Sequence, residues 1–110
     1  MPRGEHLGEF EQVVLLAVLR LDPDGNGVTI RAEIEARTGR DASVGAVYAT
    51  LDRLEDKGSL ESREGTPRPR RGGRAPRHYR ITAEGRSALD EARRVLDALW
   101  EGFERGAGSA

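Results

Sequence analysis

Apolar side chains recur every three or four residues near the start of the chain, which is the spacing of one helical face. These positions are Phe10, Val13, Val14, Ala17 and Leu21. They predict a first helix over residues 8–21, which ends at the Pro- and Gly-rich residues 23–27. A second helix is expected over residues 30–37, with Thr29 as its N-cap, Gly39 as its stop, and Ile30 and Ile34 on its buried side.

A third helix is predicted after Ser43, whose hydroxyl can cap it, and before Gly58, which provides a C-terminal break. Its apolar stripe consists of Val44, Val47, Leu51 and Leu54. The opposite face holds Ala46, Ala49 and Arg53, with Thr50 close by. Because this face carries mostly small side chains, the helix can approach another surface closely.

The pattern then changes to short alternation, which is typical of strands. Residues 60–63 and 78–81 predict two strands, and in the second one Tyr79 and Ile81 alternate with His78 and Arg80. The segment between them contains three prolines and three glycines, which prevent a helix. We therefore expect a two-stranded hairpin, or wing, over residues 59–81.

A final helix should begin after Thr82 and reach about residue 104, followed by a flexible tail over residues 105–110. Its apolar positions follow the heptad spacing of a coiled-coil seam, which favours a partner helix. These positions are Leu89, Ala92, Leu96, Leu99 and Phe103, with Val95 and Trp100 widening one edge. The elements together predict a mainly α fold. Residues 1–81 form a winged helix-turn-helix domain of three helices and a β-wing, and residues 82–104 form a C-terminal dimerisation helix.

Charge is distributed unevenly along the 110 residues, although the net charge is only −1. Residues 63–80 contain seven arginines and one acid, whereas residues 1–62 contain seven bases and twelve acids. A basic segment on an acidic body suits a focused contact with phosphates. The alternative is a solvated Arg-rich loop.

The third helix and the basic hairpin together favour binding to double-stranded DNA. The expected contacts from the helix are Ser43, Gly45, Ala46, Tyr48, Ala49, Thr50 and Arg53. Those from the hairpin are Arg70, Arg71, Arg74 and Arg77, which would contact phosphates or the minor groove. A winged helix used as a protein-interaction module, with its arginines on an acidic partner, is the alternative.

Five segments together resemble the PadR family of bacterial winged-helix transcriptional regulators, named after a repressor of phenolic acid decarboxylase genes. They are residues 8–19, 30–39, 45–55, 72–74 and 79–85, and the resemblance extends over about residues 8–100. It implies that residues 44–56 form the recognition helix, that Tyr48 matches the family's tyrosine there, and that residues 72–74 lie along the DNA backbone. The chain resembles the branch with a single C-terminal helix.

The resemblance also implies a homodimer, formed by the last helix with help from the first. The expected interface residues are Phe10, Val14, Leu89, Ala92, Leu96, Leu99, Trp100 and Phe103. Such a dimer would bind an inverted repeat, most simply as a repressor. Some short members bind flat aromatic drugs between subunits through a tryptophan of this helix. Trp100 is the one tryptophan here, and packing in the dimer seam is the interpretation we favour for it over an aromatic effector site.

One motif matches a calcium loop, because residues 22–33 satisfy the pattern D-x-D-x-N-G-x5-E. Thr29 occupies the position where such loops place an apolar residue, and Glu33 is needed inside the second helix, so we expect a Gly-rich turn and no metal site. There is no cysteine for zinc or for nucleophilic attack. The serines have no histidine near them in sequence, so we expect no enzyme activity and no cofactor.

The longest apolar run, residues 13–19, is far shorter than the roughly 20 residues that span a bilayer. Glu5, Glu9 and Glu11 stand where a signal peptide would carry bases followed by an apolar stretch. We therefore expect a cytoplasmic protein without a membrane segment.

Overall fold

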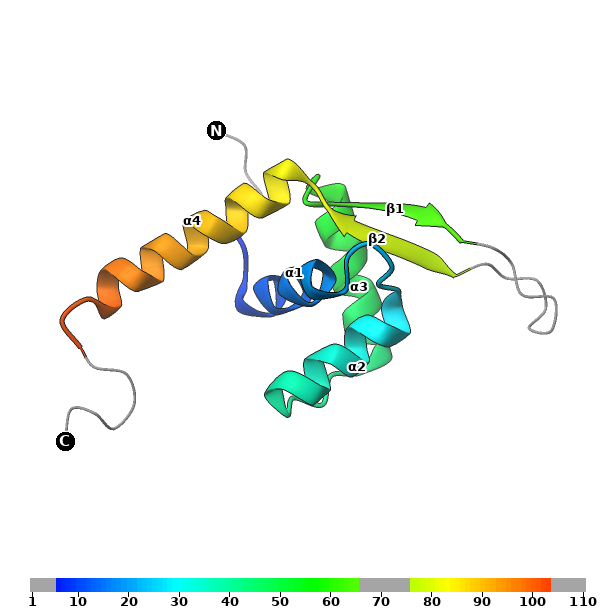
Figure 1. Ribbon diagram of the computed structural model, residues 1–110, viewed down its shortest axis with the longest axis horizontal. Coiled ribbons are helices and arrows are strands. Elements are labelled where there is room, and N and C mark those ends of the chain that lie inside the picture. Colours follow the sequence, from blue (N-terminus) through cyan, green and yellow to red (C-terminus); the bar gives the residue numbers. More distant parts are fainter. Residues whose placement is uncertain (1–5, 66–75, 104–110) are drawn as a thin grey trace.

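A computed structural model describes residues 6–65 and 76–103 and contains, in those ranges, four helices and one two-stranded sheet (Figure 1). The elements in chain order are α1 (Glu9–Leu21), α2 (Gly27–Thr38), α3 (Val44–Asp56), β1 (Leu60–Glu64), β2 (Arg77–Ile81) and α4 (Ala83–Trp100). This confirms the predicted mainly α architecture with a two-stranded hairpin. The final helix ends at Trp100, about a turn earlier than expected, and Phe103 follows it in an exposed bend.

The core lies between α1, α2 and α3, and the base of the hairpin closes it (Figure 1). Each helix contributes side chains that are fully buried, and their burial is the main favourable term in folding. The largest of them are Leu15, Ile30, Leu51, Leu54, Val14, Val18 and Val47. Leu60 of β1, Tyr79 of β2 and Leu89 of α4 join this core, so the first turns of α4 are anchored to the body.

Local capping explains where the helices begin. The Ser43 hydroxyl accepts a hydrogen bond from the Ala46 amide at 3.0 Å, and the Thr82 hydroxyl accepts one from Gly85 at 3.0 Å, so both predicted N-caps are confirmed. The predicted start of the second helix is wrong. Asn26 is the N-cap of α2 and accepts from the Val28 and Thr29 amides, while the Thr29 hydroxyl accepts from the Asn26 amide. This reciprocal capping box starts α2 three residues earlier than expected.

The hairpin pairs Leu60 with Ile81 at its base and Glu64 with Arg77 at its outer end. The loop between α1 and α2 is docked along β2, where the Tyr79 amide donates to the Gly25 carbonyl at 2.9 Å. Arg80 also pairs with Asp22 at 3.2 Å. These contacts attach the hairpin to the helical body and set its direction relative to α3.

The acids of the calcium-like motif form ion pairs with arginines in this arrangement. Asp22 pairs with Arg80, Asp24 lies 3.7 Å from Arg63, and Glu33 accepts from Arg20 at 2.7 Å. Within residues 6–65 and 76–103, no three His, Asp or Glu side chains are grouped so that they could hold a metal ion. None of the helices in these ranges is both long and apolar enough to cross a membrane.

A buried carboxylate ties α1 to the end of α3. Glu11 accepts hydrogen bonds from the Lys57 ammonium at 2.8 Å, the Gly8 amide at 2.9 Å and the Arg53 guanidinium at 3.4 Å. Burial by itself would raise the pKa of this carboxyl, but the bonds from Lys57, Gly8 and Arg53 together outweigh burial and lower the pKa below its ordinary value of 4.5.

We expect Glu11→Gln to lower the free energy of unfolding by about 2 kcal/mol at pH 7, because Lys57 loses a charged partner. A carboxyl whose pKa is lowered by folding stabilises the protein fully above its unfolded-state pKa, and the contribution disappears as the pH falls through the folded-state pKa. The difference between parent and variant should therefore shrink progressively below pH 4.5. Urea unfolding at a series of pH values measures it, and a difference that does not vary with pH would contradict the electrostatic cause.

Candidate nucleic-acid interface

The outer surface of α3 is the first candidate for contact with DNA. Ser43, Gly45, Ala46, Tyr48 and Ala49 are all exposed, so these predicted contact residues lie on an accessible face. The first half of α3 carries no charged side chain, whereas Asp52, Glu55 and Asp56 lie in its second half. The positive end of the helix dipole attracts a polyanion to the N-terminal turns, and the acidic residues repel it from the second half of the helix.

Tyr48 connects this surface to the start of α2. Its ring packs so closely over Gly27 that a Cβ at that position would overlap the phenol. Tyr48 is nevertheless 39% exposed, and its hydroxyl lies beside Gly27 in the first turn of α2. Gly27 therefore provides the space in which Tyr48 is held between the two helices that a helix-turn-helix presents to DNA.

Two of the predicted base-reading residues are placed differently. Thr50 was expected near the outer face, but its side chain is only 2% exposed and packs on the buried side of α3, so this expectation is wrong. Arg53 is exposed, but its guanidinium donates to Glu11 and, at 3.3 Å, to the Thr50 hydroxyl. Arg53 is thus directed toward α1, and we do not count it among the residues that meet bases.

Arg77 is the one hairpin arginine of the predicted set that falls within the described residues. It is exposed and donates to the Ser62 hydroxyl at 2.9 Å, while Ser62 donates to Glu55 at 2.7 Å. A polar groove of about 800 Å³ lies between α3 and the hairpin, lined by Tyr48, Asp52, Glu55, Glu64, Pro76, Arg77 and Tyr79. Arg70, Arg71 and Arg74 lie outside the described residues.

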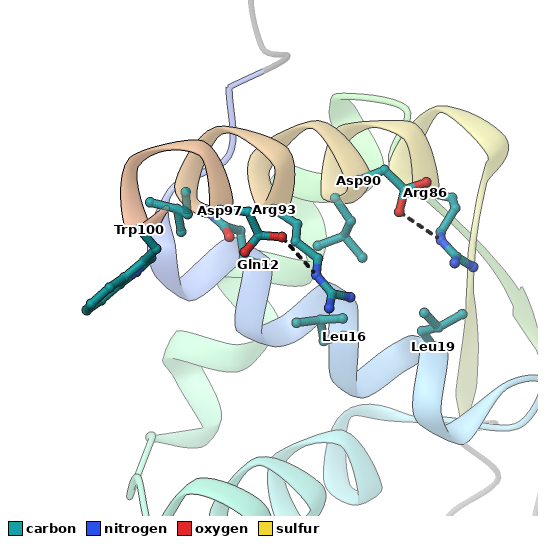
Figure 2. A pocket seen from close by; sticks show the side chains of 10 residues that line it. Gln12, Leu16, Leu19, Arg86, Asp90, Arg93, Asp97 and Trp100 are labelled. Atoms are coloured by element: carbon teal, nitrogen blue, oxygen red, sulfur yellow. Dashed lines mark hydrogen bonds and ion pairs between the residues drawn. The ribbon is translucent and has the colours of Figure 1, made fainter. Parts of the chain in front are cut away.

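A second candidate surface lies between α1 and α4. A groove of about 670 Å³ is lined on the α1 side by Gln12, Leu16 and Leu19 and on the α4 side by Arg86, Leu89, Asp90, Arg93, Leu96, Asp97 and Trp100. Figure 2 shows Leu16 and Leu19 facing α4 across this groove, with ion pairs between Arg86 and Asp90 and between Arg93 and Asp97 along α4. The groove is lined by both apolar and charged side chains.

The C-terminal half of α4 extends away from the helical body (Figure 1). Leu99 is 72% exposed and Trp100 is 57% exposed, and Leu96 and Phe103 are exposed as well. Ala92 is half-buried. Exposed apolar side chains on the end of a helix and in the bend that follows it have a free-energy cost in water that a partner surface would remove.

Three residues of the expected seam are engaged within the chain. Val14 is fully buried in the core, so its side chain is not free to meet a partner, and placing it in the dimer interface was wrong. Leu89 is also largely buried against the core, but it lines the groove between α1 and α4. Phe10 packs at the margin of the core, and the Arg40 guanidinium lies 5.5 Å from the centre of its ring. Leu16, which the sequence analysis did not single out, is exposed on α1 and lines the groove.

The fold consists of three helices and an antiparallel hairpin that packs beside α3. This arrangement defines a winged-helix protein. Solved structures share this fold. F93 from STIV, described as a winged-helix DNA-binding protein, superposes with a TM-score of 0.67 at 19% identity over 84% of this chain and 92% of that one. A PadR family transcriptional regulator from Eggerthella lenta DSM 2243 superposes with a TM-score of 0.66 at 25% identity over 86% and 81% of the two chains.

The sequence comparisons identify the family. Residues 15–91 match the description "Transcriptional regulator PadR-like family". Transcriptional regulator Rv3488 of Mycobacterium tuberculosis (strain ATCC 25618 / H37Rv) is 41% identical over 78 residues, which cover 71% of this chain and 68% of that protein. The chain belongs to the PadR-like family of transcriptional regulators; it is a winged-helix regulator of the DNA-binding kind and not an enzyme.

Proposed function

We propose that the protein binds double-stranded DNA as a homodimer, that α3 of each subunit enters the major groove, and that binding represses transcription. The observation that carries this proposal is the exposed, uncharged N-terminal half of α3, with Ser43, Gly45, Ala46 and Ala49 at its surface. Small side chains let the helix backbone approach base edges, and the Tyr48 hydroxyl and Arg77 flank it as donors to phosphate.

The dimer in this proposal is formed by the apolar face of α4 and the groove beside α1. Leu96, Leu99, Trp100 and Phe103 of one subunit would be covered by α1 and α4 of the other, with Leu16 at the centre of the contact. Two α3 helices related by a two-fold axis read an inverted repeat, with half-sites roughly one helical turn, about 34 Å, apart.

Selection of bound duplexes from a random library by the purified protein tests the proposal. We expect an inverted repeat with this spacing, and repression of a reporter whose promoter contains it. Failure to bind any duplex at about 50 mM salt would contradict DNA binding, because even non-specific binding is favoured at low salt. Binding to an acidic protein would then be the function to test for the arginines.

Replacing Arg70, Arg71 and Arg74 together by alanine should weaken binding to every duplex by a similar factor. If each arginine contacts one phosphate, the slope of log affinity against log salt should become shallower by about 2.7 for each subunit. Titrations at several salt concentrations measure this slope. Arg94→Ala is the control, since Arg94 pairs with Glu91 on α4 and its loss should leave the slope unchanged. An unchanged slope in the triple variant would exclude these side chains from the interface.

We propose as an alternative role for Trp100 that it forms part of a site for a planar aromatic effector, on the surface that the dimer would cover. Trp100 takes part in a second, largely apolar depression of about 350 Å³ with Leu96, Leu99 and Phe103, which gives a flat ring a surface to stack on. Because Trp100 is the one tryptophan of the chain, a ligand there should quench its fluorescence and release DNA over the same concentration range. Quenching without release would indicate a ligand that does not regulate binding.

A further inference from the structure

Val44 is exposed although the helical periodicity places it on the apolar stripe of α3. Its side chain is 53% exposed, whereas Val47, Leu51 and Leu54 of the same stripe are fully buried. The difference arises because Val44 is the first residue of α3, ahead of the turn at which the body begins to cover the helix. The structure therefore presents an isopropyl group at the N-terminal end of the recognition helix.

The surroundings of Val44 leave this group open to a partner. A Cβ added at Gly45 would meet no atom within 4 Å, so the space beside Val44 is unfilled. Tyr48 lies one turn further along the same side of α3, and Ser43 and Ala46 are small and exposed. No side chain with a charge occurs among residues 42–51 to compete for a nearby donor or acceptor.

Of the four bases, thymine alone presents a methyl group on the major-groove edge; the others present hydrogen-bond donors and acceptors there. An isopropyl group neither donates nor accepts hydrogen bonds. Burying it against a polar base edge removes water from that edge without replacing its hydrogen bonds, whereas burying it against a methyl group removes apolar surface from water. A valine at this position can therefore both favour thymine and disfavour other bases.

We propose that Val44 is a specificity-determining residue that contacts the 5-methyl group of a thymine in each half-site. This inference rests on the proposed entry of α3 into the major groove. The N-terminal residues of a recognition helix meet base edges, and Val44 is the largest exposed aliphatic side chain in the first turn of α3.

The test uses the duplex selected by the parent protein, with each thymine of the half-site replaced in turn by deoxyuridine, which lacks only the methyl group. At one thymine we expect the Kd to rise about fourfold, the value for one buried methyl group. Val44→Ala should bind the thymine and uracil duplexes equally at that position. Its thermal stability should match that of the parent, because the Val44 side chain is exposed.

Val28→Ala is the matched control. Val28 is 68% exposed in the first turn of α2, next to Gly27, and its loss should leave the thymine-to-uracil ratio at the parent's value. The inference is overturned if Val44→Ala keeps the parent's ratio, if Val28→Ala removes it instead, or if the selected half-site contains no thymine. In these cases DNA binding by α3 still stands, whereas failure of the parent to bind any duplex overturns both.

Discussion

Replacing both Leu96 and Leu99 by glutamate should convert the protein into a folded monomer that has lost most of its affinity for an inverted repeat. Both side chains are exposed in the single chain, so the change should leave the core intact. In a dimer they would be buried, and two carboxylates on each subunit would then be desolvated without partners. Losing the second half-site should lower affinity for the repeat by about 10²- to 10⁴-fold.

Sedimentation and duplex titration measure the two consequences separately. Ala98→Glu is the control, because Ala98 lies on the opposite side of α4 from Leu96 and is exposed; this variant should remain dimeric and bind as the parent does. A double variant that stays dimeric would place the subunit contact elsewhere. A monomer that binds the repeat as tightly as the parent would remove dimerisation from the mechanism.

Gly85→Ala should strongly destabilise the protein. Gly85 is buried in the first turn of α4, where a Cβ would overlap the Ser59 carbonyl oxygen and lie 2.9 Å from a side-chain carbon of Ile81. The Ser59 carbonyl also accepts from the Thr82 amide at 3.0 Å, so it cannot move freely. We expect the free energy of unfolding to fall by about 3 kcal/mol, which is the cost of overpacking a side chain against backbone atoms.

The same chemical change at Gly45 gives the matched control. Gly45 is also in the first turn of a helix, but a Cβ there would meet nothing, so Gly45→Ala should stabilise the protein by up to about 1 kcal/mol through helix propensity. Urea unfolding at one fixed protein concentration compares the two, because the stability of a dimer depends on concentration. Equal effects at Gly85 and Gly45 would contradict close packing of α4 on the hairpin.

The two ends of α4 differ: Gly85 is closely packed at its start, whereas Leu96 and Leu99 are exposed near its end. Its start is fixed to the base of the hairpin, and its C-terminal half is free of the body (Figure 1). A rigid start would transmit the geometry of the dimer to the two hairpins and the two α3 helices. In our proposal, an effector that changes the packing around Trp100 would therefore change the distance between the DNA-binding surfaces.

Local signals in the sequence were sufficient for most of the fold. The periodicity of α1 and α3, the caps Ser43 and Thr82, and the alternation around Tyr79 each involve residues close together in the chain, so they predicted the elements and their order. The resemblance in five separate segments was sufficient to predict the family, and the comparisons confirm that prediction.

The tertiary structure decided which apolar and polar side chains remain available at the surface. Periodicity shows that Val14 and Leu89 lie on apolar faces, but it cannot tell the core of one chain from the interface of two, and both proved to be core. Val44 is exposed because the body does not cover the first turn of α3, and Thr50 is buried because the covered face of α3 is wider than the apolar stripe. These outcomes depend on contacts between residues far apart in sequence, which no local pattern contains.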